Sequence, residues 1–389
     1  MKDVYIVDYA VRDCLGVNAS SNYLNMPLTK GPQPITRYDT SEYPQVLTTN
    51  GYQMPIEFNP KENIGFKMAV DLADELAGKY ELPKDTAILV SAMALGSSIK
   101  DDFLRAFDSH QRRFSPTRLF MANHDLLSSL LSKRLNLEGF SASLNAACSS
   151  SMFNLYLAYL MIRAGDTGAA LVGGVESPLW PSFQYHWQCT SAISTTDGGI
   201  CRPFDKSRDG FLQGEGGTLL YLCDEATLRE RNLTPKAVIR SIVAGAKVHT
   251  ITAHDPTGEH QGLLMDRAVN QSGLSYDDIS FFNAHATSTP VGDDIEFDAF
   301  AKKFEDIDIP IVAFKGYIGH TMSACGALES VYGIEAVKNG FIHPNVGLTN
   351  PLTNDSRVIT EQRSLHSKAF MKASFGFGGR TSIAVIEAV

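Results

Sequence analysis

The chain has 389 residues, of which 44% are hydrophobic and 20% are charged. This globular composition excludes a disordered tail, a collagen-like fibre and a disulfide-stabilised mini-protein. With 34 basic and 43 acidic residues, the formal net charge is −9, which offers no broad surface for nucleic acid.

The spacing of the cysteines and the length of the apolar runs indicate the cellular compartment that we expect for the protein. The six cysteines are scattered without CxxC spacing, and the N-terminal stretch lacks the apolar run of a signal peptide. The longest purely apolar run, Leu155–Ile162, has eight residues, whereas a membrane span requires roughly 20. We therefore expect a soluble protein in a reducing, cytoplasmic setting, with no membrane partner.

Short apolar or β-branched runs recur along the chain between helical patterns, and most end near glycine or another small residue. Such alternation predicts a layered α/β fold. In chain order, the predicted strands are Val4–Val7, Ala87–Ala92, Ser141–Leu144, Ala169–Val172, Ile279–Phe282, Ile311–Phe314 and Ile383–Ile386. The segment Gly16–Asn59 has weak periodicity and is predicted to be irregular.

Each half of the chain contains one segment that is predicted to be a buried helix. The first opens at Cys148 and is apolar almost all round, which is typical of a helix in the middle of a molecule. The second runs from about Thr321 to Val337 and follows a glycine-rich turn over residues 315–320. Its small side chains, such as Ala324 and Gly326, permit close approach of another backbone.

Cys148 is the strongest candidate nucleophile. It stands where a strand-like run stops, small residues form a turn and the apolar helix begins. A thiol at a helix N-terminus feels the positive end of the helix dipole, which lowers its pKa and favours the thiolate. The alternative is an inert thiol packed in the core, the commonest fate of a cysteine. We expect the other five cysteines to be inert core thiols.

Two of the ten histidines, His285 and His320, follow predicted strands that end in small residues. This is the sheet edge at which α/β folds place functional groups, although either residue could also be a hydrogen-bonded structural histidine. Because neither an HExxH motif nor a Cys/His cluster occurs, no metal site is predicted. A cysteine and two imidazoles in separate turns indicate acyl chemistry, with a nucleophile and groups that act on a carbonyl oxygen.

Six motifs occur in order between residues 85 and 389: AACSSS (146–151), GGVES (173–177), RPFDKSRDGFLQGEGG (202–217), NAHATSTPVGDDIE (283–296), KGYIGHTMSACGALE (315–329) and SFGFGGR (374–380). With these motifs, the chain resembles the elongating β-ketoacyl-acyl carrier protein synthases of the thiolase superfamily, the KAS I/II type. The resemblance implies a thiolase fold, a five-layered α-β-α-β-α sandwich of two similar halves with the two buried helices as its middle layer. We place the halves at residues 1–230, with the nucleophile and cap insertions, and 231–389, with the two histidines.

The resemblance also assigns the catalytic residues by motif. Cys148 is the acyl acceptor, and His285 and His320 are the catalytic histidines. Lys315 lies five residues before His320 and matches the family's lysine, and Glu329 lies nine residues after it and matches the glutamate that organises the site.

Three more matches concern the substrate arm and the oxyanion. Thr287 and Thr289 match the threonines that hydrogen-bond the phosphopantetheine arm. Phe377 matches a gating phenylalanine whose backbone N–H joins that of Cys148 in the oxyanion hole. No bound cofactor is implied, since the substrates are carried on the phosphopantetheine of acyl carrier protein.

The implied reaction is the decarboxylative Claisen condensation of an acyl group on Cys148 with malonyl carrier protein, in fatty-acid or type II polyketide (polyene) elongation. One alternative is a non-elongating acyltransferase or hydrolase on the same fold, which could keep Cys148 and one histidine. Another is a ketosynthase-like scaffold subunit, but such a subunit would normally lack the cysteine. The resemblance implies a homodimer, with a heterodimer containing a second ketosynthase-like subunit as the alternative.

An acidic carrier protein requires basic residues near the channel mouth. We select Arg208, Lys206 and Arg134 as candidates for carrier-protein docking. Two residues depart from the family pattern, since Ala286 and Arg380 stand where the family usually has glycine and threonine.

The charged loop residues Asp205, Asp209 and Glu215 are predicted to brace loops rather than to act in catalysis, because most charged loop residues are scaffold.

Overall fold

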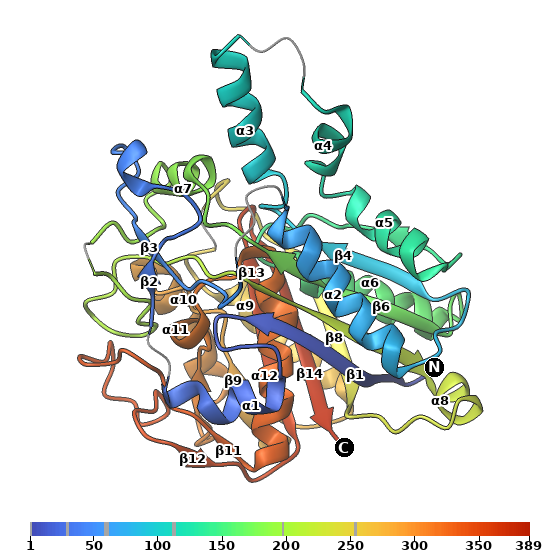
Figure 1. Cartoon of the computed structure of the whole chain (residues 1–389). Coiled ribbons are helices and arrows are strands. Elements are labelled where there is room, and N and C mark those ends of the chain that lie inside the picture. Colours follow the sequence, from blue (N-terminus) through green and yellow to red (C-terminus); the bar gives the residue numbers. More distant parts are fainter. Residues whose placement is uncertain (1, 29–30, 58–61, 111–113, 197, 253–254) are drawn as a thin grey trace.

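Two half-sheets of the same topology organise the computed structural model, which describes residues 2–28, 31–57, 62–110, 114–196, 198–252 and 255–389 (Figure 1). The first half-sheet has the order β5-β4-β6-β7-β1 and the second the order β10-β9-β13-β14-β8. The strands of the first are β1 (Val4–Asp13), β4 (Ala87–Ser91), β5 (Ser141–Ala142), β6 (Ala169–Glu176) and β7 (Gly216–Asp224). Those of the second are β8 (Ala237–Ala246), β9 (Ile279–Asn283), β10 (Ile311–Val312), β13 (Ala369–Gly376) and β14 (Arg380–Ala388).

Strand direction repeats as well as strand order. In the first half, β1, β7 and β6 are antiparallel neighbours, while β6, β4 and β5 run parallel. In the second, β8, β14 and β13 are antiparallel neighbours, while β13, β9 and β10 run parallel. The half-sheets join where Val4–Ile6 of β1 pair with 237–239 of β8. The two halves are therefore structural duplicates, although no repeat is visible in the sequence.

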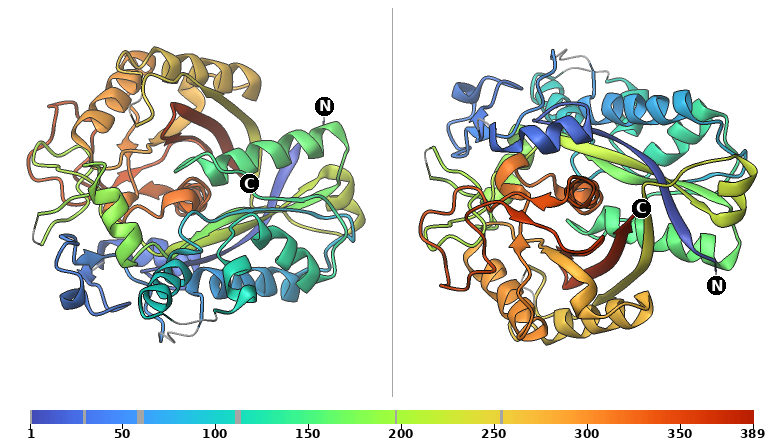
Figure 2. Two further views of the ribbon diagram at one scale, coloured as in Figure 1. Left: turned by 90° about the horizontal axis from the view of Figure 1, so that it is seen from above. Right: turned by 90° about the horizontal axis from the view of Figure 1, so that it is seen from below.

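Helices fill and cover this pair of half-sheets in a five-layered arrangement (Figure 2). The central layer contains α6 (Ser150–Ala164) and α12 (Cys325–Asn339), which pack on one another and on both half-sheets. The outer face of the first half-sheet is covered by α2 (Ile64–Lys79) and α5 (Leu126–Leu135). The outer face of the second is covered by α9 (Glu259–Ser272) and α10 (Pro290–Lys303). The two helices predicted to be central are confirmed.

Alternation along β7 shows why the strands are apolar on both faces. Leu220 and Leu222 belong to the central core around α6 and α12. Leu219 and Tyr221 belong to the outer core under α2 and α5. A strand with helices on both faces buries successive side chains in different cores, so its sequence reads as a continuous apolar run.

All seven predicted strands are present, although β5 and β10 are each two residues shorter than expected and β4 is one residue shorter. Among the described strands of the two half-sheets, three were not predicted: β7, β8 and β13. The continuous apolar run of β7 cannot be told from a buried helix segment by periodicity alone, and Lys372 interrupts the apolar run of β13. The division at residue 230 stays a prediction; it falls between α8 (Glu225–Glu230) and β8.

The N-terminal segment Gly16–Asn59 is mostly irregular where it is described, but it also contains α1 (Ala19–Asn25), which packs on α12. Residues 29–30 and 58–59 of that segment lie outside the described residues. Its short elements are 3-10 turns at Met26–Leu28 and Thr40–Glu42 and the two-stranded pair β2 (Gln33–Pro34) and β3 (Asn50–Gly51). A further small pair is β11 (Phe341–Ile342) and β12 (Arg363–Ser364).

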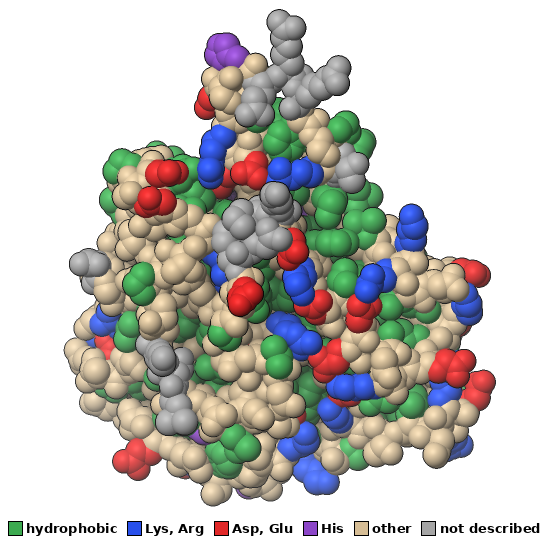
Figure 3. All heavy atoms as spheres, in the orientation of Figure 1, with side chains coloured by type: hydrophobic (Ala, Val, Ile, Leu, Met, Phe, Trp, Pro, Cys, Tyr) green, Lys and Arg blue, Asp and Glu red, His purple; other side chains and the backbone are tan. Residues whose placement is uncertain are grey.

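A helical extension, α3 (Ser97–Asp108) and α4 (Pro116–Met121), projects from the body of the molecule (Figure 1). It carries exposed hydrophobic side chains (Figure 3), and Phe107 and Phe120 are among the large hydrophobic residues that are exposed. In the part of the chain that the structure describes, no helix has the length and apolar character needed to cross a membrane.

Candidate active site

The turn between β5 and α6 presents Cys148 to the interior. Helix α6 begins at Ser150, so Cys148 lies two residues before it. The preceding residue, Ala147, has a φ of 51°, a left-handed conformation that is strained for a residue with a side chain. Gly376 at the end of β13 permits the close approach, because a Cβ there would lie 2.3 Å from the Ala146 carbonyl oxygen. The sheet thus holds the Cys148 turn in a fixed place.

The expected lowering of the Cys148 pKa is wrong. Burial raises the pKa of the thiol, and the neighbouring Cys325 raises it further, while the positive charge of Lys315 lowers it by less. Cys148 is only 5% exposed, and desolvation of a thiolate outweighs its position near a helix start. In the resting protein Cys148 is therefore a protonated thiol.

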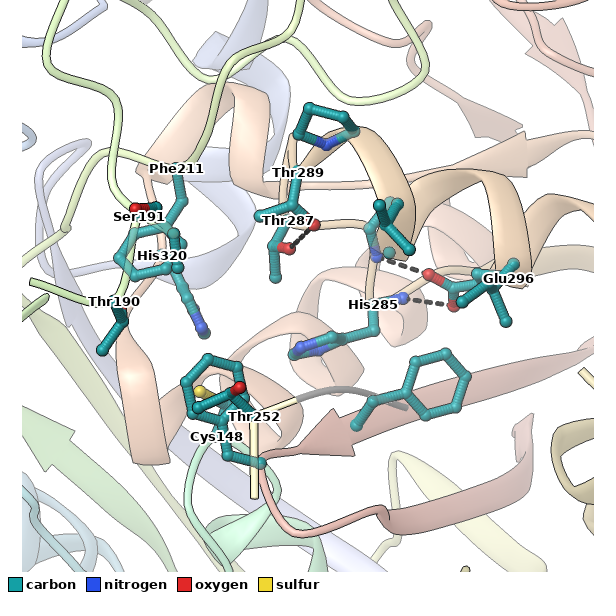
Figure 4. A pocket seen from close by; sticks show the side chains of 18 of the residues that line it. Cys148, Thr190, Ser191, Phe211, Thr252, His285, Thr287, Thr289, Glu296 and His320 are labelled. Atoms are coloured by element: carbon teal, nitrogen blue, oxygen red, sulfur yellow. Dashed lines mark hydrogen bonds between the residues drawn. The ribbon is translucent and has the colours of Figure 1, made fainter. Parts of the chain in front are cut away.

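His285 and His320 face each other across a cavity of about 430 Å³ that Cys148 also lines (Figure 4). The two imidazole centroids are 5.6 Å apart and the rings are nearly perpendicular. His285 comes from the loop after β9, and His320 follows the short helix α11 (Lys315–Ile318). That helix occupies part of the segment predicted to be a glycine turn; Gly319, with a φ of 70°, ends it. One thiol and two imidazoles from separate turns thus meet in one cavity.

Glu296 of α10 fixes the His285 loop. Its carboxylate accepts hydrogen bonds from the backbone N–H groups of His285 and Ala286, at 2.7 and 2.6 Å. Burial raises the pKa of Glu296 to about 7, and those two N–H donors lower it. The departure at Ala286 is accommodated, because this residue does not adopt the left-handed conformation that favours glycine.

The tautomer of His285 follows from its neighbour Lys315. The Nζ atom of Lys315 lies 3.4 Å from Nδ1 of His285. An ammonium group has donors and no acceptor, so Nδ1 of His285 accepts this hydrogen bond and the ring proton is on Nε2. His285 therefore offers Nε2–H as a hydrogen-bond donor.

His320 is completely buried, and its two ring nitrogens have no hydrogen-bond partner among the described residues. The ring of Phe211 packs edge-to-face against it, with centroids 4.9 Å apart. Burial, together with the positive charges of Lys315 and Lys372, lowers the pKa of His320 well below its usual value. His320 is therefore a neutral imidazole that lines the cavity, and no described residue occupies either its donor or its acceptor.

Behind the histidines lies a fully buried cluster of charged side chains, and one of them, Lys372, was not predicted from the sequence. Glu329 accepts a hydrogen bond from Lys315 at Oε1, at 2.6 Å, and a second from Lys372 at Oε2. All three side chains have zero exposure. Lys372 could have been suspected as the one charged residue in the apolar run of β13.

Thr287 and Thr289 also line the cavity (Figure 4), and so does Phe377. The hydroxyls of Thr287 and Thr289 are 3.0 Å apart, and the residue between them, Ser288, has a φ of 65°. Phe377 packs against Trp187 with ring centroids 5.3 Å apart. Trp187 is a cavity residue that the sequence did not single out.

The docking role expected for Arg208 is wrong, because its side chain is buried in structural contacts. Its guanidinium donates to the carbonyl oxygens of Asp205, Thr289 and Pro290 and to Asp294 Oδ1. These bonds join the 205–208 loop to the start of α10. Lys206, by contrast, is exposed, and Arg134 is half exposed and paired with Asp74.

The acidic residues of the same motif do brace loops, as predicted. Asp205 accepts from the backbone N–H groups of Ser207, Thr349 and Asn350. Asp209 accepts from the hydroxyls of Ser194 and Thr196, and Glu215 is held by the guanidinium of Arg37.

Comparisons with known proteins show the family of the chain. Family models for the N-terminal and C-terminal domains of β-ketoacyl synthase match residues 72–226 and 236–349. The chain is 28% identical to the chloroplastic 3-oxoacyl-[acyl-carrier-protein] synthase II of Arabidopsis thaliana, over 97% of this chain and 74% of that protein.

Two solved structures share the fold over 100% of this chain. One is a type II polyketide ketosynthase in complex with its acyl carrier protein, with a TM-score of 0.90, 19% identity and 100% of that chain covered. The other is the ishigamide ketosynthase/chain length factor, with a TM-score of 0.89, 20% identity and 99% covered. This likeness confirms the thiolase fold.

Proposed function

Because the chain belongs to the β-ketoacyl synthase family, we propose that it is an elongating β-ketoacyl-acyl carrier protein synthase. It joins an acyl group on Cys148 to a malonyl unit, with loss of CO2, in fatty-acid or type II polyketide elongation. The observation that carries this proposal is the cavity in which one thiol and two imidazoles face each other.

The first half-reaction transfers the acyl group. The sulfur of Cys148 attacks the thioester carbon of the acyl carrier protein, the bond to the pantetheine sulfur breaks, and the proton of the Cys148 thiol passes to that sulfur. The backbone N–H groups of Cys148 and Phe377 hold the oxyanion of the tetrahedral intermediate. Thr287 and Thr289, which line the cavity, hydrogen-bond the pantetheine arm.

The second half-reaction makes the carbon nucleophile. His285 Nε2–H and the N–H of His320 donate to the thioester oxygen of malonyl carrier protein. The bond to the carboxylate breaks, CO2 leaves, and its electron pair forms an enolate whose negative oxygen the two donors stabilise. Neutral imidazoles suit this role, because each keeps one N–H donor throughout and no step requires it to give up a proton.

Condensation closes the cycle. The enolate carbon attacks the acyl carbon on Cys148, and the tetrahedral oxyanion collapses with cleavage of the bond to sulfur. The Cys148 thiolate leaves and regains a proton from solvent, and β-ketoacyl carrier protein is released. The burial that raises the pKa of Cys148 disfavours a free thiolate, so each acyl transfer depends on the oxyanion donors.

The partners are acyl carrier protein in its acyl and malonyl forms, and a second copy of this chain. The complex of a ketosynthase with its carrier protein supports the first. A heterodimer is the alternative, because one of the similar solved structures is a ketosynthase/chain length factor. Light scattering of the purified chain alone will decide between a homodimer and a heterodimer.

Lys206 and Arg134 stay candidates for carrier-protein docking. Lys206→Glu is expected to slow turnover of carrier-protein substrates more than turnover of pantetheine substrates.

Intact-protein mass spectrometry tests the function. We expect wild-type protein to gain an acyl adduct on Cys148 from acyl carrier proteins of graded chain length, and to release β-ketoacyl carrier protein after malonyl carrier protein is added. An adduct that yields only free acid or a transferred acyl group would replace condensation by hydrolysis or acyltransfer. No adduct at any chain length would point to a scaffold subunit.

A further inference from the structure

We propose that Lys372 is a positioning residue that sets the orientation and tautomer of His285 by holding Glu329 against Lys315. This inference rests on the proposed function for its catalytic consequence, but not for the hydrogen bonds that carry it. Lys372 lies on β13, a strand that contributes no other charged side chain.

Lys372 is an ammonium ion with every donor in use. Its Nζ atom donates to Asn283 Oδ1 and to the carbonyl oxygen of Ala284, each at 3.2 Å, and to Glu329 Oε2. Three acceptors match the three N–H groups of an ammonium, whereas a neutral amine would leave one buried acceptor unfilled. The charge is therefore held inside the protein by a complete set of partners.

Through Glu329, this ammonium controls where Lys315 points. Because Lys372 takes Oε2, the carboxylate presents Oε1 to Lys315 at 2.6 Å. The Nζ atom of Lys315 is then left 3.4 Å from Nδ1 of His285, where it fixes the proton on Nε2. Without Lys372, Glu329 could rotate and accept from Lys315 with either oxygen. The Nζ atom of Lys315 would then no longer be held beside Nδ1 of His285.

A second route runs through the backbone. Asn283 and Ala284 directly precede His285, and Lys372 binds both of them. The side-chain amide of Asn283 donates in turn to the carbonyl oxygen of Glu329, at 2.8 Å. These hydrogen bonds connect the end of β9 to β13 and α12 directly before His285. Displacement of Lys372 would therefore shift the backbone of His285 as well as the position of its ring proton.

The test compares Lys372→Met with Lys368→Met. The methionine keeps the length and loses the donors, and Lys368 is an exposed lysine that immediately precedes the same strand. Because a misplacement of about 1 Å can cost about 10²-fold in rate, we expect Lys372→Met to lower kcat for decarboxylation of malonyl carrier protein by about that factor. Its KM and its acylation of Cys148 should stay within about threefold of wild type, since neither step depends on the His285 tautomer. Lys368→Met should match wild type.

Spectra of ¹⁵N-histidine-labelled protein supply a readout that a purely structural role would not move. Wild type should show His285, assigned with a His285→Gln variant, as the Nε2–H tautomer, and Lys372→Met should show a mixture of tautomers. Unchanged His285 signals together with wild-type decarboxylation would overturn the proposal. So would equal losses in acylation and decarboxylation that follow a lower Tm.

Lys372→Gln covers the case in which the methionine variant does not fold. Glutamine keeps N–H donors for the β9 acceptors but removes the charge from Glu329, so the same loss of decarboxylation and mixed tautomers are expected, and wild-type behaviour would refute the proposal. If wild-type protein itself does not decarboxylate malonyl carrier protein, the proposed function fails, while the His285 spectrum still decides the role of Lys372.

Discussion

Two cysteines occupy related places in the two halves of the molecule. Cys148 lies just before central helix α6, and Cys325 is the first residue of central helix α12. Both are buried, the Sγ atom of Cys325 is 3.3 Å from the carbonyl oxygen of Cys148, and burial raises the pKa of both thiols. Cys148 lines the cavity and Cys325 is absent from its lining. A helix start alone therefore does not distinguish Cys148 from Cys325; the strained turn at Ala147 and the cavity do.

The largest expected effect separates these two thiols. Cys148→Ala should abolish acyl-adduct formation, a loss of at least about 10³-fold, because the attacking atom is gone. Cys325→Ala should stay within about fivefold of wild type, because it removes one buried sulfur without touching the cavity wall. Intact mass after mixing with acyl carrier protein measures both. A folded Cys325→Ala protein that forms no adduct would show that the two cysteines act as one unit.

The next effect concerns the contact between the halves at Arg208. Arg208→Ala leaves Asp293 buried without its neighbouring cation, and loss of one partner of a buried pair costs about 3–5 kcal/mol. We expect the free energy of unfolding to fall by about 3 kcal/mol, and turnover of carrier-protein and pantetheine substrates to fall together, because the Thr289 carbonyl also loses its donor. Urea unfolding and paired kinetics check this. Loss confined to carrier-protein substrates would restore the docking role.

Site residues that lie in ordered motifs could be predicted from the sequence, whereas contacts that depend on sheet register could not. Cys148, His285 and His320 stand at ends of predicted strands, where topology brings functional groups together whatever the details of packing. The ion pair of Lys372 with Glu329 instead requires β13 to lie beside β9, and β13 was not predicted. Arg208 seemed a surface cation because a motif does not reveal which side chains are buried.

The pKa of Cys148 was mispredicted for a similar reason. A helix start can be read from the sequence, but the burial that outweighs it arises from residues distant in the chain, such as Gly376 and Phe377. The duplicated topology was also hidden, since strand order and direction can repeat while the side chains that fill each core differ.

Between pH 8 and pH 5, where the raised pKa of Cys148 has no effect on stability, His320 gives a pH dependence. Its folded-state pKa lies well below the usual 6.5, so the unfolded chain binds the extra proton first as the pH falls. The free energy of unfolding therefore falls as the pH drops below about 6.5, by up to about 1.4 kcal/mol per pH unit until the folded-state pKa is reached. Urea unfolding of wild type and His320→Gln from pH 8 to pH 5 should therefore show the free energy of unfolding of wild type falling relative to that of the variant, because glutamine does not titrate. A constant difference would mean that His320 titrates normally.

The smallest effects compare the alanines beside the two kinds of catalytic group. Ala147, before Cys148, has a φ of 51°, whereas Ala286, after His285, does not adopt a left-handed conformation. Glycine at 147 relieves the strain and should raise the free energy of unfolding by about 0.5–1 kcal/mol. Glycine at 286 relieves nothing and adds freedom to the unfolded chain, so it should lower that free energy by about 0.4–1 kcal/mol. Urea unfolding of the two variants should give opposite signs, and equal signs would show that the strain at Ala147 is not what distinguishes the nucleophile turn.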